Sequence, residues 1–156
     1  MYLPRFRATP AGDVRVALAP EEREALRELA GAVRELVGED TDDPSLRRLF
    51  PPAHDDPELQ AGYSELTRAQ LKRGREQALD LLQETVDQDL LSADEADAWL
   101  RALNDVRLVL GTRLDVTEDF DWEGLRPDDP RAADVAAYAY SSWLQEQLVE
   151  ATGRLY

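Results

Sequence analysis

The stretch WLRALNDVRLVLGTRL, residues 99–114, decides the fold of this chain. When successive residues are placed about 100° apart around a helix, its tryptophan, valines, alanine and most of its leucines fill one broad arc. Arg101, Asp105 and Thr112 fall on the opposite side, where we expect them to face water. A helix with so wide an apolar arc must be covered by other elements. The stretch therefore predicts a central helix, beginning near residue 93.

Four polar residues interrupt this helix and are its candidate structural pins: Asn104, Asp105, Arg107 and Arg113. Arg107 falls inside the apolar arc, and a buried guanidinium must be paired, because its desolvation costs several kcal/mol. Its partner is expected to be a carboxylate or several carbonyls from another element, with Asp43, Asp55, Asp56 and Glu65 as candidates. Arg113 lies at the helix end and can extend into solvent. Gly111 is expected to let another segment come close.

Two interpretations of Asn104 and Arg107 remain open. In the first, they fix the register of a helical bundle through hydrogen bonds to neighbouring elements. In the second, Arg107 lines a pocket that binds an anion or a partner protein. The sequence offers no acid, base or nucleophile that would complete a reaction centre around them. We therefore expect a protein that is not an enzyme.

The rest of the chain predicts a mainly α fold, a small bundle of four to five helices with an N-terminal β-hairpin, in a single domain over residues 1–156. Period-two alternation around a Gly-Asp turn predicts the hairpin within residues 1–18. Repeated Asp-Asp-Pro tripeptides and a Ser-Ala-Asp-Glu capping box are typical of helix starts. These signals and the apolar spacing predict helices at 20–37, 44–50, 57–86, 93–114 and 130–151.

The composition excludes several classes of protein. The formal net charge is −15 and the isoelectric point is about 4.4, so the surface repels phosphate backbones and DNA is expected to be contacted weakly or indirectly. There is no cysteine and one histidine, which excludes thiol chemistry and the usual zinc sites, and we predict no metal and no cofactor. Neither a signal peptide nor a membrane-spanning run is present, so a cytoplasmic location is expected.

An acidic, aromatic loop is the candidate partner-contact segment. Its residues are Asp119, Phe120, Asp121, Trp122 and Leu125. Alternation of acids with aromatics suits docking into a basic, apolar groove on another protein. The alternative is that the aromatic rings fold back and cap the core of this chain.

Basic side chains gather on one helix face. Arg68, Lys72 and Arg75 share that face and form a weak candidate phosphate contact. The alternative is that they are solvated helix charges that pair with nearby acids. On the last helix, the alanines, aromatics and leucines from Ala133 to Ala151 predict a core-facing stripe. The weaker face with Val135, Tyr138 and Val149 could contact the hairpin or form a homodimer.

The chain resembles an actinobacterial family of unknown function in three features. They are the central helix with residues 99–114, here called the signature helix, the hairpin with its glutamate-rich helix start, and the run from Asp43 to Pro51 followed by Asp-Asp-Pro. That family is named for the oxidative-stress transcriptional regulator AosR. The resemblance implies a cytoplasmic regulator that acts with a sigma factor and RNA polymerase. The alternative is a proteolysis-linked adaptor with a Clp-related partner, or another protein-binding module of unknown function. The resemblance brings no catalytic residues. Because the chain has no cysteine, a thiol switch cannot operate within it.

Overall fold

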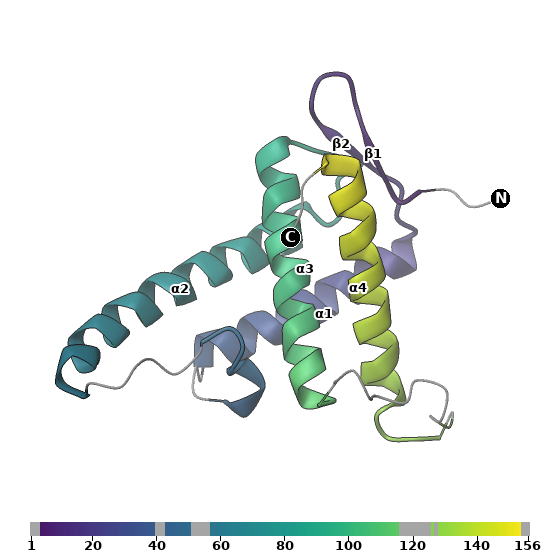
Figure 1. The fold of residues 1–156 in the computed structure, drawn as a ribbon. Coiled ribbons are helices and arrows are strands. Elements are labelled where there is room, and N and C mark those ends of the chain that lie inside the picture. Colours follow the sequence, from purple (N-terminus) through teal and green to yellow (C-terminus); the bar gives the residue numbers. More distant parts are fainter. Residues whose placement is uncertain (1–3, 40–42, 51–56, 116–125, 127, 154–156) are drawn as a thin grey trace.

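A computed structural model describes residues 4–39, 43–50, 57–115, 126 and 128–153, without the side chains of 57–64. Four helices surround a common core: α1 (Pro20–Glu39), α2 (Pro57–Thr85), α3 (Ala93–Arg113) and α4 (Ala132–Thr152). Figure 1 shows α3 at the centre, beside α4 and crossed by α1 and α2. The mainly α class and the central position of the signature helix are confirmed.

The N-terminal hairpin is present but belongs to a larger sheet. Strands β1 (Phe6–Ala8) and β2 (Val14–Val16) pair antiparallel around a turn in which Gly12 has a φ of 91°. The short strand β3 (Leu90–Leu91), between α2 and α3, adds to the edge of β2. Strand β3 was not predicted from the sequence, because two residues are too few to show an alternation. The third strand gives the otherwise marginal hairpin its support.

The start of α3 follows from its capping box. The hydroxyl of Ser92 accepts from the amide of Glu95 at 3.1 Å, and the Glu95 carboxylate accepts from the amide of Ser92 at 2.8 Å. Both bonds satisfy amides that a helix start leaves without partners. The predicted bounds of α3 differ from the observed ones by one residue at its end, and those of α2 likewise.

Two predicted helices need correction. The segment predicted as a helix at 44–50 contains a single 3-10 turn, η1 (Pro44–Leu46), followed by turns. Asp43 does cap it, since its carboxylate accepts from the amide of Ser45 at 2.8 Å. The last helix begins at Ala132 and not at Pro130, because Asp129 accepts from the amide of Arg131 at 2.8 Å and holds a turn there. At Asp43 the start signal was correct but the helix predicted after it was not, whereas α4 is a helix as predicted and begins two residues later than its signal.

The core lies where the helices meet the sheet. Trp99 is fully buried, donates from Nε1 to the Thr85 hydroxyl at 2.7 Å, and meets the edge of the Phe6 ring at 6.1 Å between centroids. The predicted stripe of α4 is partly wrong: Leu144 and Leu148 are buried, but the alanines at 133 and 136 are exposed.

No helix among the described residues is long and apolar enough to cross a membrane.

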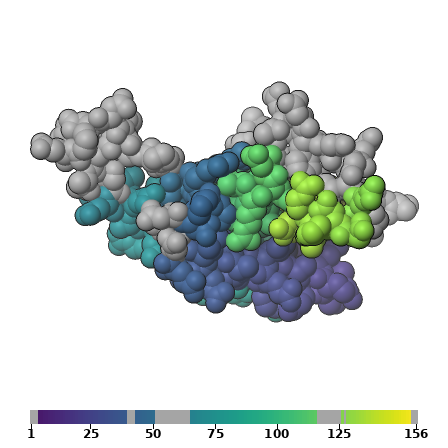
Figure 2. All heavy atoms as spheres, turned by 90° about the horizontal axis from the view of Figure 1, so that it is seen from below, coloured from purple at the N-terminus to yellow at the C-terminus, as the bar shows by residue number. Residues whose placement is uncertain are grey.

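The C-terminal end of α3 is packed on two sides. Figure 2, seen from below, shows it between the segment that follows η1 and the beginning of α4. A Cβ atom placed on Gly111 would lie 3.1 Å from Cε2 of Tyr138 and 3.6 Å from an Nη atom of Arg48. The close approach expected at Gly111 is therefore present, and it fixes how near α4 lies to α3.

Candidate functional site

A triad of polar side chains joins α3 to α4. Arg107 donates from Nε to Oε1 of Gln145 at 3.0 Å and from Nη2 to Oδ1 of Asn104 at 2.8 Å. Gln145 in turn donates from Nε2 to the same Asn104 oxygen at 3.3 Å. The guanidinium is therefore held from two sides by amide groups. We call these three residues the amide–guanidinium triad.

The triad decides between the two kinds of partner expected for Arg107. Arg107 is partly buried, as predicted, and its partners are carbonyl oxygens of two side-chain amides, not the carboxylate of Asp43 or Glu65. The other two candidates, Asp55 and Asp56, lie outside the described residues. Amide oxygens satisfy N–H donors without neutralising the charge, so Arg107 keeps its positive charge uncompensated among the described residues.

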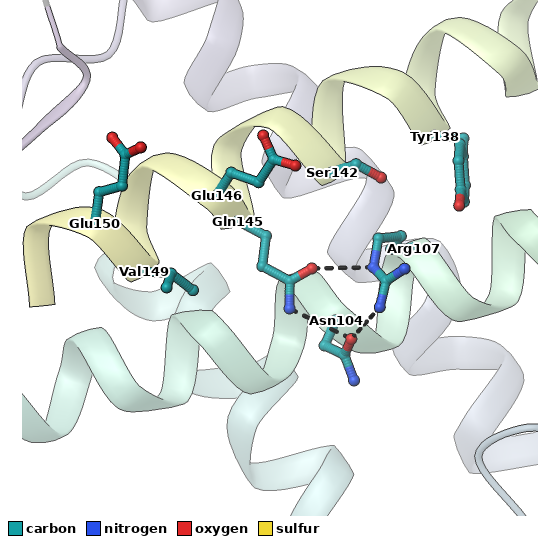
Figure 3. Close-up of a pocket in the computed structure, with 8 residues that line it drawn as sticks. All are labelled: Asn104, Arg107, Tyr138, Ser142, Gln145, Glu146, Val149 and Glu150. Carbon is teal, nitrogen blue, oxygen red and sulfur yellow. Dashed lines mark hydrogen bonds between the residues drawn. The ribbon is translucent and has the colours of Figure 1, made fainter. Parts of the chain in front are cut away.

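The triad forms part of the lining of a groove between α3 and α4 with a volume of about 620 Å³. Figure 3 shows its lining, which is completed by Tyr138, Ser142, Glu146, Val149 and Glu150. All five come from α4, so the groove follows the length of that helix. Its volume lies within the range of about 300–1,000 Å³ that is usual for ligand pockets.

The groove carries separated charges. Two of the five N–H donors of Arg107 are used within the triad, and the other three have no partner among the described residues. Glu146 and Glu150 are exposed and form no ion pair within the described part of the chain. The hydroxyl of Ser142 is buried and has no hydrogen-bond partner there. These groups are available to a ligand.

A second polar contact lies on the other side of α3. Arg75 of α2 forms an ion pair with Asp105, whose side chain is 1% exposed. Burial raises the pKa of Asp105 to about 6, and the charge of Arg75 opposes that shift. The expectation that Asp105 and Thr112 face water was therefore wrong: both are buried, because α2 and the η1 segment cover the side of α3 that the periodicity left open. Arg101 and Arg113 are exposed, as expected.

The basic face of α2 is mostly engaged with the protein itself. Arg75 and Arg68 each lie 6.0 Å from the centroid of the Phe50 ring, and Arg68 also donates to the Phe50 carbonyl at 3.4 Å. Lys72 donates to the carbonyl of Gly38 at 3.4 Å. These contacts favour the interpretation of paired helix charges over a phosphate site. The candidate contact loop, Asp119, Phe120, Asp121, Trp122 and Leu125, lies outside the described residues.

The polar residues of the α4 half of the groove were not predicted from the sequence, although Tyr138 and Val149 of its lining belong to the weaker face considered above. Ser141, Gln145 and Leu148 lie on one buried face at i, i+4 and i+7 spacing, so two polar residues share a face with a core leucine. That spacing was the available signal, because a polar residue on a buried face needs a partner. Glu146 and Glu150 carry no such signal, since exposed acids at i, i+4 spacing are common on helices.

Comparison with known proteins identifies the family. The profile of the family described as "Domain of unknown function (DUF2017)" matches residues 4–152, which is nearly the whole chain. The chain belongs to this family. In this member of the family, the amide–guanidinium triad joins the central helix α3 to α4, and the buried ion pair joins it to α2.

Curated relatives are found in mycobacteria. The protein "Oxidative stress regulator AosR" of Mycobacterium tuberculosis is 31% identical over 187 aligned positions, which cover 94% of this chain and 81% of the relative. The protein of that name from Mycobacterium bovis gives the same values. The alignment is longer than this chain, so the relatives carry additional residues inside the matched region. No solved structure matches.

Proposed function

We propose that this chain is a cytoplasmic, non-enzymatic regulator of the oxidative-stress response, which acts through contact with a sigma factor or RNA polymerase. The observation that carries the proposal is the 31% identity, over 94% of the chain, to proteins named as oxidative stress regulators. Transcription machinery is the partner we propose, because the net charge of −15 disfavours direct DNA binding and favours basic protein surfaces.

The proposed mode of action does not depend on oxidation of this chain. It has no cysteine, and Met1 is its single methionine, so it offers no thiol and no internal thioether to an oxidant. The signal must then reach the chain through a partner or a ligand. The uncompensated charges of the α3–α4 groove give the described part of the chain a place where such an input could be received.

The proposal is tested by deleting the gene and measuring transcripts after a peroxide challenge. A regulator predicts that part of the response is lost, and that the wild-type chain restores it. Binding of the purified chain to RNA polymerase reconstituted with each host sigma factor identifies the partner. A response that is unchanged after deletion contradicts the proposal. Binding to Clp components without polymerase or sigma factor favours the proteolysis-linked adaptor instead.

A further inference from the structure

We propose that the α3–α4 groove binds the free carboxylate end of a short peptide that carries a positive charge two to four residues earlier. The carboxylate would bind at Arg107, and the positive charge would lie between Glu146 and Glu150. This inference is independent of the proposed function, because it is drawn from the groove alone. The same chemistry is offered by a free peptide and by the C-terminal tail of a protein.

The carboxylate end is determined by Arg107. Its planar guanidinium has three unengaged N–H donors, and a fork of this kind matches the two oxygens of a carboxylate. Asn104 and Gln145 hold it in place before any ligand arrives, so little side-chain freedom is lost on binding. Figure 3 shows the Ser142 hydroxyl directed toward the end of the groove where Arg107 and Tyr138 lie. An oxygen of the ligand would give that hydroxyl the partner it lacks.

The position of the positive charge follows from helix geometry. Ser142, Glu146 and Glu150 are spaced by four residues and line the same groove. At about 1.5 Å of rise per residue, the two carboxylates lie about 6 and 12 Å along α4 from Ser142. An extended peptide spans about 3.3–3.6 Å per residue, so two to four residues separate its carboxylate from a cation that reaches these acids.

The charges of the groove disfavour ligands that are purely anionic. Two unpaired carboxylates in the groove and a net charge of −15 repel a polyanion such as a nucleic acid and disfavour inorganic phosphate. A ligand with one negative and one positive charge can pair with Arg107 at one end of the groove and with Glu146 and Glu150 at the other. Tyr138 and Val149 add apolar surface to the lining of the groove, which suits the backbone and small side chains of a peptide.

The probe is N-acetylated lysyl-alanyl-alanine with a free carboxylate, titrated into the full chain and followed by ¹H–¹⁵N NMR, including the Arg107 Nε–H signal. We expect shifts at Arg107 and at the amides of Glu146 and Glu150. Amidation of the peptide should lower its affinity about tenfold or more, because a charge-assisted bidentate pair is lost. Equal binding of the amidated peptide, displacement by inorganic phosphate, or no shift at millimolar peptide would overturn the inference.

Matched variants separate the two ends of the groove. Arg107→Gln should weaken every peptide with a free carboxylate, whereas Arg113→Gln, an exposed cation of the same helix, should weaken none. The double variant Glu146→Gln/Glu150→Gln alters exposed residues and should leave the fold intact. It should weaken the lysyl peptide but not its all-alanine counterpart, and Glu28→Gln/Glu35→Gln on α1 is its control. A loss equal for both peptides would overturn the assignment of the cation end.

A final arm distinguishes the source of the ligand. The tripeptide sequence is fused to the C-terminus of an inert carrier protein, and its affinity is compared with that of the free peptide. Equal affinity shows that the groove accepts protein tails as well as free peptides, and binding of the free peptide alone assigns it to small peptides. Binding of neither, with a well-folded chain, contradicts the inference.

Discussion

Arg75 and Asp105 form an ion pair that joins α2 to α3, and the Asp105 side chain is 1% exposed while that of Arg75 is 25% exposed. Asp105 Oδ2 and Arg75 Nε are buried without further partners among the described residues. The carboxylate therefore depends on a single contact for its compensation. Because of this difference in burial, substitution of Arg75 and substitution of Asp105 should change the free energy of unfolding by different amounts.

Replacing Arg75 should harm the protein more than replacing Asp105. Arg75→Met leaves a buried carboxylate without a partner and should lower the free energy of unfolding by about 3 kcal/mol at pH 7. Asp105→Asn leaves a partly exposed guanidinium that can turn to water, so its loss should be smaller. Urea denaturation measures both. The double variant Arg75→Met/Asp105→Leu should be more stable than Arg75→Met alone, and a further loss would contradict this account.

The raised pKa of Asp105 predicts a pH dependence with a definite sign. Between pH 4 and 6 the folded state holds a proton on Asp105 that the unfolded state has released, so stability from this group falls as the pH rises. A shift from 3.8 to about 6 corresponds to about 3 kcal/mol. Denaturation of wild type and Asp105→Asn at several pH values isolates the effect from the other carboxylates. A difference that grows in favour of wild type from pH 4 to 6 would refute it.

The amide–guanidinium triad should respond unequally to its substitutions. Asn104→Ala removes the oxygen that accepts from both other members and should destabilise the fold by about 1–2 kcal/mol. Arg107→Met should be milder, because Gln145 still donates to Asn104. Thermal denaturation gives the order, and ¹⁵N relaxation at Arg107 Nε should show greater mobility in the Asn104 variant. Unchanged mobility would mean that Asn104 does not hold the guanidinium.

Two helical glycines should respond in opposite directions. Gly111→Leu forces a side chain against the Tyr138 ring and should destabilise by about 2–3 kcal/mol. Gly74 has no atom within 4 Å of a built Cβ, so Gly74→Ala should stabilise by about 0.5–1 kcal/mol through better helix propensity. Chemical denaturation of both variants separates the effect of packing at Gly111 from the effect of replacing a glycine within a helix. A stable Gly111→Leu protein would show that α4 can move away from α3.

Peroxide should leave the fold unchanged. The chain has no cysteine, and its single methionine is the first residue, so oxidation should add oxygen at Met1 and leave the helical circular dichroism unaltered. Mass spectrometry of the treated protein locates the change. Loss of helical signal at a peroxide dose that modifies Met1 alone would show that the chain senses oxidants by a route the proposed function does not include.

The parts of the fold that the sequence predicted are those set by local chemistry. The Ser92 capping box marks the start of α3, and the apolar arc around Trp99 marks its central position, since both depend on neighbours along the chain. The burial of Asp105 and the partners of Arg107 could not be predicted in this way. They depend on which side of α3 is covered by α2 and α4, and periodicity within one helix does not contain that information.

The pairing of β2 with β3 bears on how the chain is made. Val14 pairs with Leu91, and the amide of Arg5 donates to Gln147, which follows it by 142 residues. The hairpin is therefore synthesised well before Leu91 and Gln147, and the N-terminal segment gains both contacts only after residue 147 has been made. A prematurely terminated copy would expose an unpaired strand edge. We expect cellular proteases to remove such copies readily, so the chains that accumulate are those that include both β3 and Gln147.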